Sequence, residues 1–176
     1  MPTSCRRLVG FLMTAALLAA PSARADGLVR VRVESPYLRS LVARATDRSA
    51  KLRGLIGQIE ATNVIVHLVC ERFSRSTLRG RTLLGAANQD VRYVRVQVDC
   101  MLPERELVAI VGHELQHVAE IAAAGEVVDG RSLSALYRAI GFPTCGFGQS
   151  EQFETGNAIR VGERVREEFS RSAAAH

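Results

Sequence analysis

The stretch GHELQHVAE, residues 112–120, places two histidines four positions apart and a glutamate directly after the first histidine. The surrounding segment opens at Pro103, runs to about Ala124 and is stopped by Gly125, which is typical of a helix. Hydrophobic residues occur almost all round it, namely Leu107, Ile110, Val111, Leu115, Val118 and Ile121. That pattern predicts a central, buried helix around which the rest of the fold packs.

Histidines at positions i and i+4 of a helix lie on one face, so both imidazoles can bind one metal ion. Glu114 is turned about 100° from His113 around the helix axis, beside that shared face. There it can take a proton from a zinc-activated water that attacks a carbonyl carbon. We therefore expect His113 and His117 to bind Zn2+ and Glu114 to act as general base. The alternative is two ordinary histidines beside an exposed glutamate.

A third protein ligand is expected to be a carboxylate, because the two remaining histidines are poorly placed. His67 lies in a predicted strand, where a packed or surface histidine is expected, and His176 is the last residue. Glu154 is the first candidate. It shares a stripe with Ala158, Val161 and Val165 on a helix predicted from about Ser150 to Ser170, and a carboxylate that faces a core needs a metal or an ionic partner.

Two further acids, Glu151 and then Glu120, are the next candidates for the third ligand. Glu151 lies one turn earlier and adjoins a smaller apolar surface. Glu120 follows His117 by three residues, and ligands at i, i+4 and i+7 of one helix fit tetrahedral zinc poorly. Glu120 is therefore expected to orient His117, with a solvated acid as the alternative. For Glu154 the alternative is a capping or buried salt-bridge residue.

The order of predicted elements indicates an α+β fold with a small, mostly antiparallel sheet before the central helix. Apolar periodicity predicts helical structure over residues 36–60, and three successive strands are predicted after it. The later elements are a short helix, a glycine-rich loop and the last helix. The three strands are predicted at 63–70, at 80–90 with a turn at 88–90, and at 91–100 with one solvent-facing side. The short helix is predicted at 132–141 and the glycine-rich loop at 141–149.

The N-terminal 25 residues have the pattern of a secretory signal peptide. Arg6 and Arg7 precede an apolar run, Leu8–Ala20, that is short for a membrane span, and Ala23–Ala25 is a small-x-small cleavage site. Cleavage is predicted after Ala25, which implies a secreted or periplasmic protein; the alternative is a retained membrane anchor. Residues 26–176 then form a single domain, with a frayed tail from about residue 171.

The composition and charge of the chain argue against nucleic-acid binding and against a membrane span after the first 25 residues. Residues 1–25 contain three of the arginines and no acid, so their removal lowers the net charge from +5 to +2. The remaining arginines are scattered and aromatic residues are few, which argues against nucleic-acid binding. No later segment is apolar enough to span a membrane. Cys70, Cys100 and Cys145 predict one disulfide among three pairings, with one thiol left over.

The GHELQH motif, followed by an acid on the next long helix, resembles the gluzincin branch of zinc metallopeptidases, especially its single-domain minimal forms. The resemblance covers the order of elements over residues 63–170, with motif identity at His113, Glu114 and His117. It implies a zincin-like fold in which an antiparallel sheet precedes the HExxH helix and a later helix carries a ligand glutamate. It also implies two histidine ligands to zinc and a glutamate base.

By the same resemblance, the substrate is a peptide or protein, aligned on a sheet edge for which residues 91–99 are the candidate, with an inner strand as the alternative. Tyr137 and Arg160 are the candidates for a transition-state donor. The stretch FETGNA, residues 153–158, departs from the family because it lacks the acid that supports the first histidine. The competing hypothesis is a non-catalytic zincin-fold module that binds a partner or serves the cell envelope. Peptide specificity and oligomeric state are left open.

Overall fold

The structure of the chain is a computed structural model that describes residues 30–74, 78–144 and 152–173. Within these residues the fold is α+β, as predicted, with five helices and a mixed sheet. The predicted signal peptide and its cleavage site lie outside the described residues. Among the helices that are described, none combines the length and hydrophobicity that a bilayer crossing requires.

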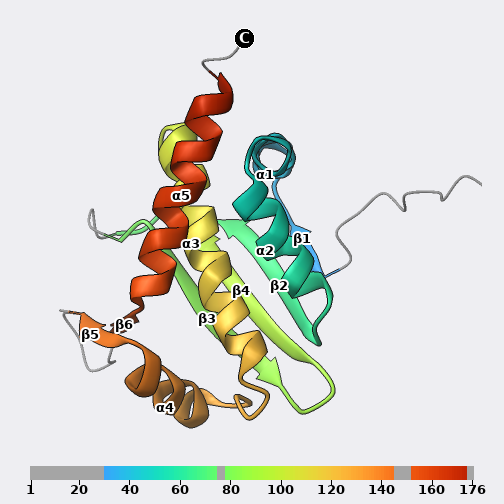
Figure 1. The fold of residues 1–176 in the computed structure, drawn as a ribbon. Coiled ribbons are helices and arrows are strands. Elements are labelled where there is room, and N and C mark those ends of the chain that lie inside the picture. The colour runs from blue at the N-terminus through green and yellow to red at the C-terminus, as the bar shows by residue number, and fades with distance from the viewer. Residues whose placement is uncertain (1–29, 75–77, 145–151, 174–176) are drawn as a thin grey trace, which may run out of the picture.

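Four strands form the sheet in the spatial order β1-β2-β4-β3 (Figure 1). They are β1 (Val31–Val33), β2 (Val64–Cys70), β3 (Gly80–Ala87) and β4 (Arg92–Val98). β1 is parallel to β2 and β2 is parallel to β4, whereas β3 pairs with β4 in the antiparallel orientation. The prediction of a mostly antiparallel sheet is therefore wrong.

The connections between the strands explain this mixed sheet. A helical crossover, α1 (Pro36–Arg48) and α2 (Ala50–Glu60), joins β1 to β2 and returns the chain to the end where β1 began. The chain then forms β3 at the far edge, and a turn at Asn88 brings β4 back between β3 and β2. As a result, residues 91–99 contain an inner strand, and β3 is the edge strand beside α3.

Helical structure over residues 36–60 is confirmed, but it is divided into α1 and α2 at Ser49. The backbone of Ser49 is extended, and its hydroxyl accepts a hydrogen bond from Leu52 N, which starts a new helix. The apolar residues predicted to share a stripe are buried, namely Leu38, Leu41, Val42, Ala45, Leu52, Leu55, Ile56 and Ile59. The hydrophobic pattern therefore identified the buried face without revealing the break.

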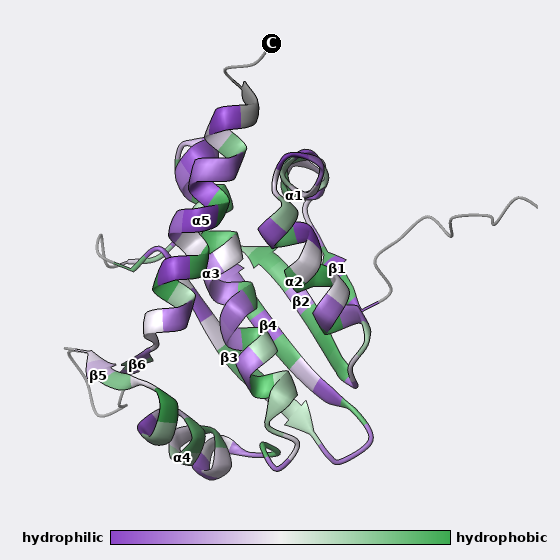
Figure 2. Ribbon diagram, in the orientation of Figure 1, coloured by the Kyte–Doolittle hydropathy of each residue, from purple (hydrophilic) through white to green (hydrophobic). Residues whose placement is uncertain are grey.

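The predicted central helix is α3 (Glu104–Ala123), and it is buried along most of its length. α3 lies across one face of the sheet, and α5 (Gly156–Ala173) packs along it (Figure 1). Both helices contribute to one contiguous hydrophobic core with α1, α2 and the inner strands. Figure 2 shows β2 as a hydrophobic strand behind the helices, whereas much of α5 is hydrophilic on its outer side.

Arg92, which was expected on the wet face of its strand, is buried at 2% exposure. Its guanidinium donates hydrogen bonds to the carbonyl oxygens of Ile121, Ala122 and Ala124 at the end of α3, and to Asn63 Oδ1. Carbonyl oxygens at the C-terminal end of a helix lack the amide donor four residues further on, although those of Ile121 and Ala124 also accept hydrogen bonds from the amides of Ala124 and Val127. Arg92 therefore fixes the C-terminal end of α3 to β4, a role that strand alternation does not reveal.

The disulfide joins Cys70 at the end of β2 to Cys100 just after β4, with the two Cα atoms 5.4 Å apart. It is one of the three predicted pairings, and Cys145 lies outside the described residues. After α3 come α4 (Gly130–Ile140) and an antiparallel pair, β5 (Phe142–Thr144) and β6 (Gln152–Glu154). The start of the predicted glycine-rich loop is thus a strand. α5 continues past residue 171, where the tail was expected to fray.

Candidate metal centre

His113, Glu114 and His117 project from the middle of α3. The two imidazole rings lie with their centroids 5.0 Å apart and their planes at 79°. α5 comes unusually close to this turn of α3, because a Cβ on Gly112 would stand 2.8 Å from Val165 Cγ2. The absence of a side chain at Gly112 therefore lets α5, and the segment that leads into it, approach the two histidines.

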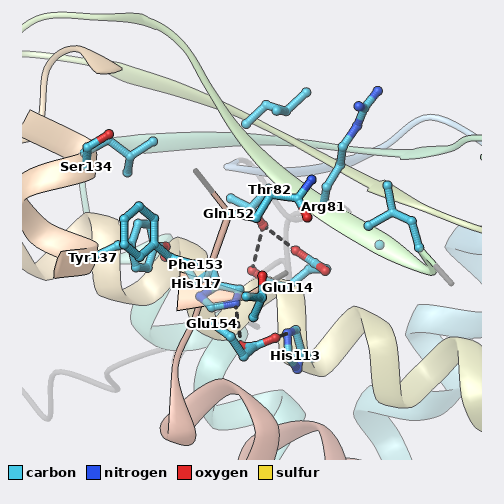
Figure 3. Close-up of a pocket in the computed structure, with 15 residues that line it drawn as sticks. Arg81, Thr82, His113, Glu114, His117, Ser134, Tyr137, Gln152, Phe153 and Glu154 are labelled. Atoms are coloured by element: carbon cyan, nitrogen blue, oxygen red, sulfur yellow. Dashed lines mark hydrogen bonds and ion pairs between the residues drawn. The ribbon is translucent and has the colours of Figure 1, made fainter. Parts of the chain in front are cut away.

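The carboxylate of Glu154 bridges the two histidines (Figure 3). Its Oε2 atom lies 3.1 Å from His113 Nε2, and its Oε1 atom lies 3.2 Å from His117 Nε2. The side chain of Glu154 is 22% exposed and that of His117 is 8% exposed, so the three groups meet at the border of the core. The structure thus brings together the three residues that the sequence suggested as metal ligands.

Glu154 reaches this position from a strand and not from the last helix, where it was predicted. It is the final residue of β6, and α5 begins only at Gly156. The intervening Thr155 caps the helix, since its hydroxyl accepts a hydrogen bond from Ala158 N. The predicted apolar stripe of α5 is buried as expected at Ala158, Val161 and Val165, but it does not extend back to Glu154.

The donor set fits a zinc ion. Two imidazole nitrogens and a carboxylate oxygen are the ligands of many catalytic zinc sites, which keep a fourth position open. The donor atoms of His113, His117 and Glu154 all lie within 4.8 Å of one another. Zinc bonds of about 2.0–2.2 Å place tetrahedral ligand atoms about 3.3–3.5 Å apart. The two histidine-to-carboxylate distances, 3.1 Å to one oxygen of Glu154 and 3.2 Å to the other, are close to that spacing.

Glu120 contacts the imidazole of His117 at Nδ1, the nitrogen that does not face Glu154, as expected. Its Oε2 atom lies 3.0 Å from Nδ1 of His117, and its Oε1 atom accepts a hydrogen bond of 2.8 Å from the Thr155 hydroxyl. Burial lowers the pKa of His117, but hydrogen bonds to Glu120 and Glu154 outweigh burial and raise it to about 9. The metal-free imidazole is therefore protonated at neutral pH and held between two carboxylates.

The pKa of Glu154 moves in the opposite direction. Burial raises it, but hydrogen bonds from His113 and His117 outweigh that effect and lower the pKa to about 2. Glu154 is therefore an anion at neutral pH. A metal-free site of this kind is an ion-pair cluster in which a proton stands in for the cation.

Glu114 lies on the side of α3 that faces the sheet and is 5% exposed. Its Oε2 atom accepts a hydrogen bond of 2.7 Å from the hydroxyl of Thr82 on β3. Burial raises the pKa of Glu114, while the neighbouring histidines lower it and do not cancel the effect of burial. A carboxylate with a raised pKa is better suited to accept and return a proton near neutral pH.

A cavity of about 410 Å³ opens beside these groups. Edge strand β3 forms one side of it, and α4 with β6 forms the other (Figure 3). Tyr137 lines the cavity, stacks on Phe153 and donates its hydroxyl to the carbonyl oxygen of His117. Arg160, the other candidate donor, is exposed on α5 and is not part of the described lining.

The remaining sequence candidates do not join the site in the described structure. His67 Nδ1 lies 3.5 Å from Glu34 Oε1, as expected of a surface histidine. Glu151 and His176 fall outside the described residues. Thr82 and Thr155, which contact Glu114 and Glu120, were missed because a single threonine gives no sequence signal until the chain is folded. No family model matches the chain, and neither a curated protein nor a solved structure matches it.

Proposed function

We propose that the protein is a secreted or periplasmic zinc-dependent peptidase. The observation that carries the proposal is the position of the Glu154 carboxylate, within 3.2 Å of Nε2 on both histidines of the HExxH motif. Two imidazoles and a carboxylate that meet at the edge of the core are stabilised by a cation that they share. The adjacent Glu114 favours an enzyme over a purely structural metal site, since a structural site has no use for a free base.

Each polar group near the cavity has a role in this proposal. His113, His117 and Glu154 would hold the zinc ion, and Glu120 orients His117 through Nδ1. When bound, zinc supplies Lewis-acid chemistry, because it lowers the pKa of a water molecule and polarises a carbonyl oxygen. Glu114 takes the proton of the attacking water and delivers it to the leaving amine.

The cavity and its edge strand favour an extended peptide as substrate. β3 lies at the edge of the sheet beside Glu114, so its outer backbone groups are available to pair with an added strand. The α4 side of the cavity is lined by Leu133, Tyr137 and Phe153. These walls suit an apolar side chain next to the scissile bond.

The cellular location is proposed from the signal-peptide pattern of residues 1–25. The Cys70–Cys100 disulfide is consistent with that location, because such bonds form and persist in oxidising compartments. Export would also separate a peptidase from cytoplasmic proteins.

The proposal is tested by counting zinc in the purified protein and by incubating the protein with a mixed peptide library. We expect one zinc ion per chain and cleavage that is lost in Glu114→Gln but kept in Glu163→Gln, a matched change at an exposed acid on α5. Loss of zinc in His117→Gln and Glu154→Gln would assign the ligands. One zinc ion per chain without cleavage would refute the peptidase and favour a binding module.

A further inference from the structure

Thr82 is the residue through which the edge strand contacts the candidate base. Its side chain points from β3 toward α3, and its Oγ1 atom lies 2.7 Å from Glu114 Oε2 and 3.2 Å from the Glu114 carbonyl oxygen. Among the described residues, Thr82 is the hydrogen-bond donor to this carboxylate. The contact joins positions 32 residues apart in the chain.

Gly80 completes the contact on the same face of β3. A Cβ there would stand 2.6 Å from Glu114 Oε1 and 2.7 Å from Ile110 Cγ2. The carboxylate of Glu114 therefore fits into the space that Gly80 leaves open, while Thr82 holds its other oxygen. β3 thus provides open space at Gly80 and a hydrogen-bond donor at Thr82, and both face the carboxylate of Glu114.

Thr82 is itself held rigidly. It pairs with Val96 of the neighbouring inner strand, so its backbone is fixed by the sheet. A β-branched side chain has a restricted χ1 angle, so the direction of the hydroxyl is set by that backbone. A glutamate, by contrast, has three side-chain torsions, and a base that is wrongly turned loses much of its effect.

We infer that Thr82 is a positioning residue that fixes the carboxylate of Glu114 for proton transfer. The inference rests on the proposed function of Glu114 as general base. It also means that the strand expected to bind the substrate and the group expected to activate water are linked through the hydroxyl of Thr82. Gly80 and Thr82 thus give β3 two roles: the strand forms one side of the cavity, and it holds the candidate base Glu114.

The competing explanation is that Thr82 only satisfies a buried polar group, which would affect stability alone. The experiment compares Thr82→Val, which keeps the shape but removes the hydroxyl, with Thr82→Ser, which keeps the hydroxyl. For the zinc-loaded protein we expect Thr82→Val to lower kcat by about tenfold to a hundredfold with KM unchanged. Thr82→Ser should stay within a few-fold of the unmodified protein. Thr46→Val, on α1, is the matched control.

A second measurement does not depend on activity. In crystal structures of the metal-free protein, Glu114 should keep its side-chain orientation in Thr82→Ser and turn away in Thr82→Val; Thr82→Ala replaces Thr82→Val if the latter does not fold. An unchanged kcat in Thr82→Val, or an unmoved carboxylate, would overturn the inference. If the unmodified protein cleaves no peptide, the peptidase proposal fails, and the crystal structures still decide whether Thr82 positions Glu114.

Discussion

Gly162 of α5 lies directly against α3 at His113: a Cβ on Gly162 would stand 3.2 Å from the Cβ of His113 and 3.0 Å from the carbonyl oxygen of Ala109. Because α5 follows Glu154 by two residues, the depth to which this helix packs sets how far the carboxylate reaches across α3. The candidate metal centre therefore depends on the close contact of two helices as much as on its ligands.

Gly162→Ala should destabilise the metal-free protein by about 1–3 kcal/mol, because the added methyl group would press on the carbonyl oxygen of Ala109, and the backbone of a buried helix would have to shift to make room. Urea unfolding measures this change in the free energy of unfolding. Gly57→Ala is the matched control, since nothing lies within 4 Å of a Cβ at that helical position. It should stabilise the protein by about 0.5–1 kcal/mol through helix propensity. A neutral or stabilising Gly162→Ala would contradict the account of the helix contact.

Glu120→Ala should weaken zinc binding by about tenfold to a hundredfold, because His117 loses the group that orients its ring and increases its basicity. Competition with a chelator of known affinity measures the change. Glu163→Gln, the matched change at an exposed acid on α5, should leave the affinity as it is. If Glu120→Ala binds zinc as tightly as the unmodified protein does, Glu120 is an ordinary buried acid.

The stability of the metal-free protein should depend on pH through His117. Its pKa rises from 6.5 to about 9 in the folded protein, so the stabilising contribution of the protonated ring is complete below about pH 6.5 and is lost as the pH rises through 9. Urea unfolding from pH 6 to 10 should show this loss, and His117→Gln should lack it. A stability difference between the two proteins that stays constant over this range would contradict the ion-pair cluster.

The contribution of Glu154 to the stability of the metal-free protein should be lost at low pH. Its pKa falls from 4.5 to about 2 on folding, so the stabilisation is complete above about pH 4.5 and disappears as the pH falls toward 2. Acid unfolding of the metal-free protein and of Glu154→Gln should therefore converge at low pH. Parallel acid transitions, with a constant separation, would show that the carboxylate is not held by the two histidines.

Arg92→Met should destabilise the protein by about 1–3 kcal/mol, because three carbonyl groups at the end of α3 lose the buried hydrogen bonds that the guanidinium donates. Arg95→Met is the control, since Arg95 is exposed on the same strand. Its effect should stay within about 0.5 kcal/mol. Equal effects of the two substitutions in urea unfolding would remove Arg92 from the account of how α3 is anchored.

Much of the site follows from local pattern. The HExxH spacing on an apolar helix predicted α3 and the face shared by His113 and His117, and the spacing of Glu154 from the apolar stripe of the last helix favoured it over Glu151 and Glu120. The predicted start of the last helix, at about Ser150, is wrong because apolar spacing does not show that Thr155 caps the helix. Capping depends on one hydroxyl, and many threonines in a chain cap nothing.

The sheet was harder to predict, because strand order depends on how distant segments pair. Three successive strands are compatible with a meander, and the sequence does not show that β3 passes to the edge while β4 returns beside β2. The contact of Thr82 with Glu114 follows from that order and from the register of β3 on β4. It could not be inferred before the sheet was known.

The central claim is that His113, His117 and Glu154 share one zinc ion. Its most direct test is the anomalous diffraction signal, at the zinc absorption edge, of crystals grown with zinc. We expect one strong peak about 2.0–2.2 Å from Nε2 of each histidine and from a carboxylate oxygen of Glu154. No peak between these three side chains, or a peak bound by other residues, would contradict it.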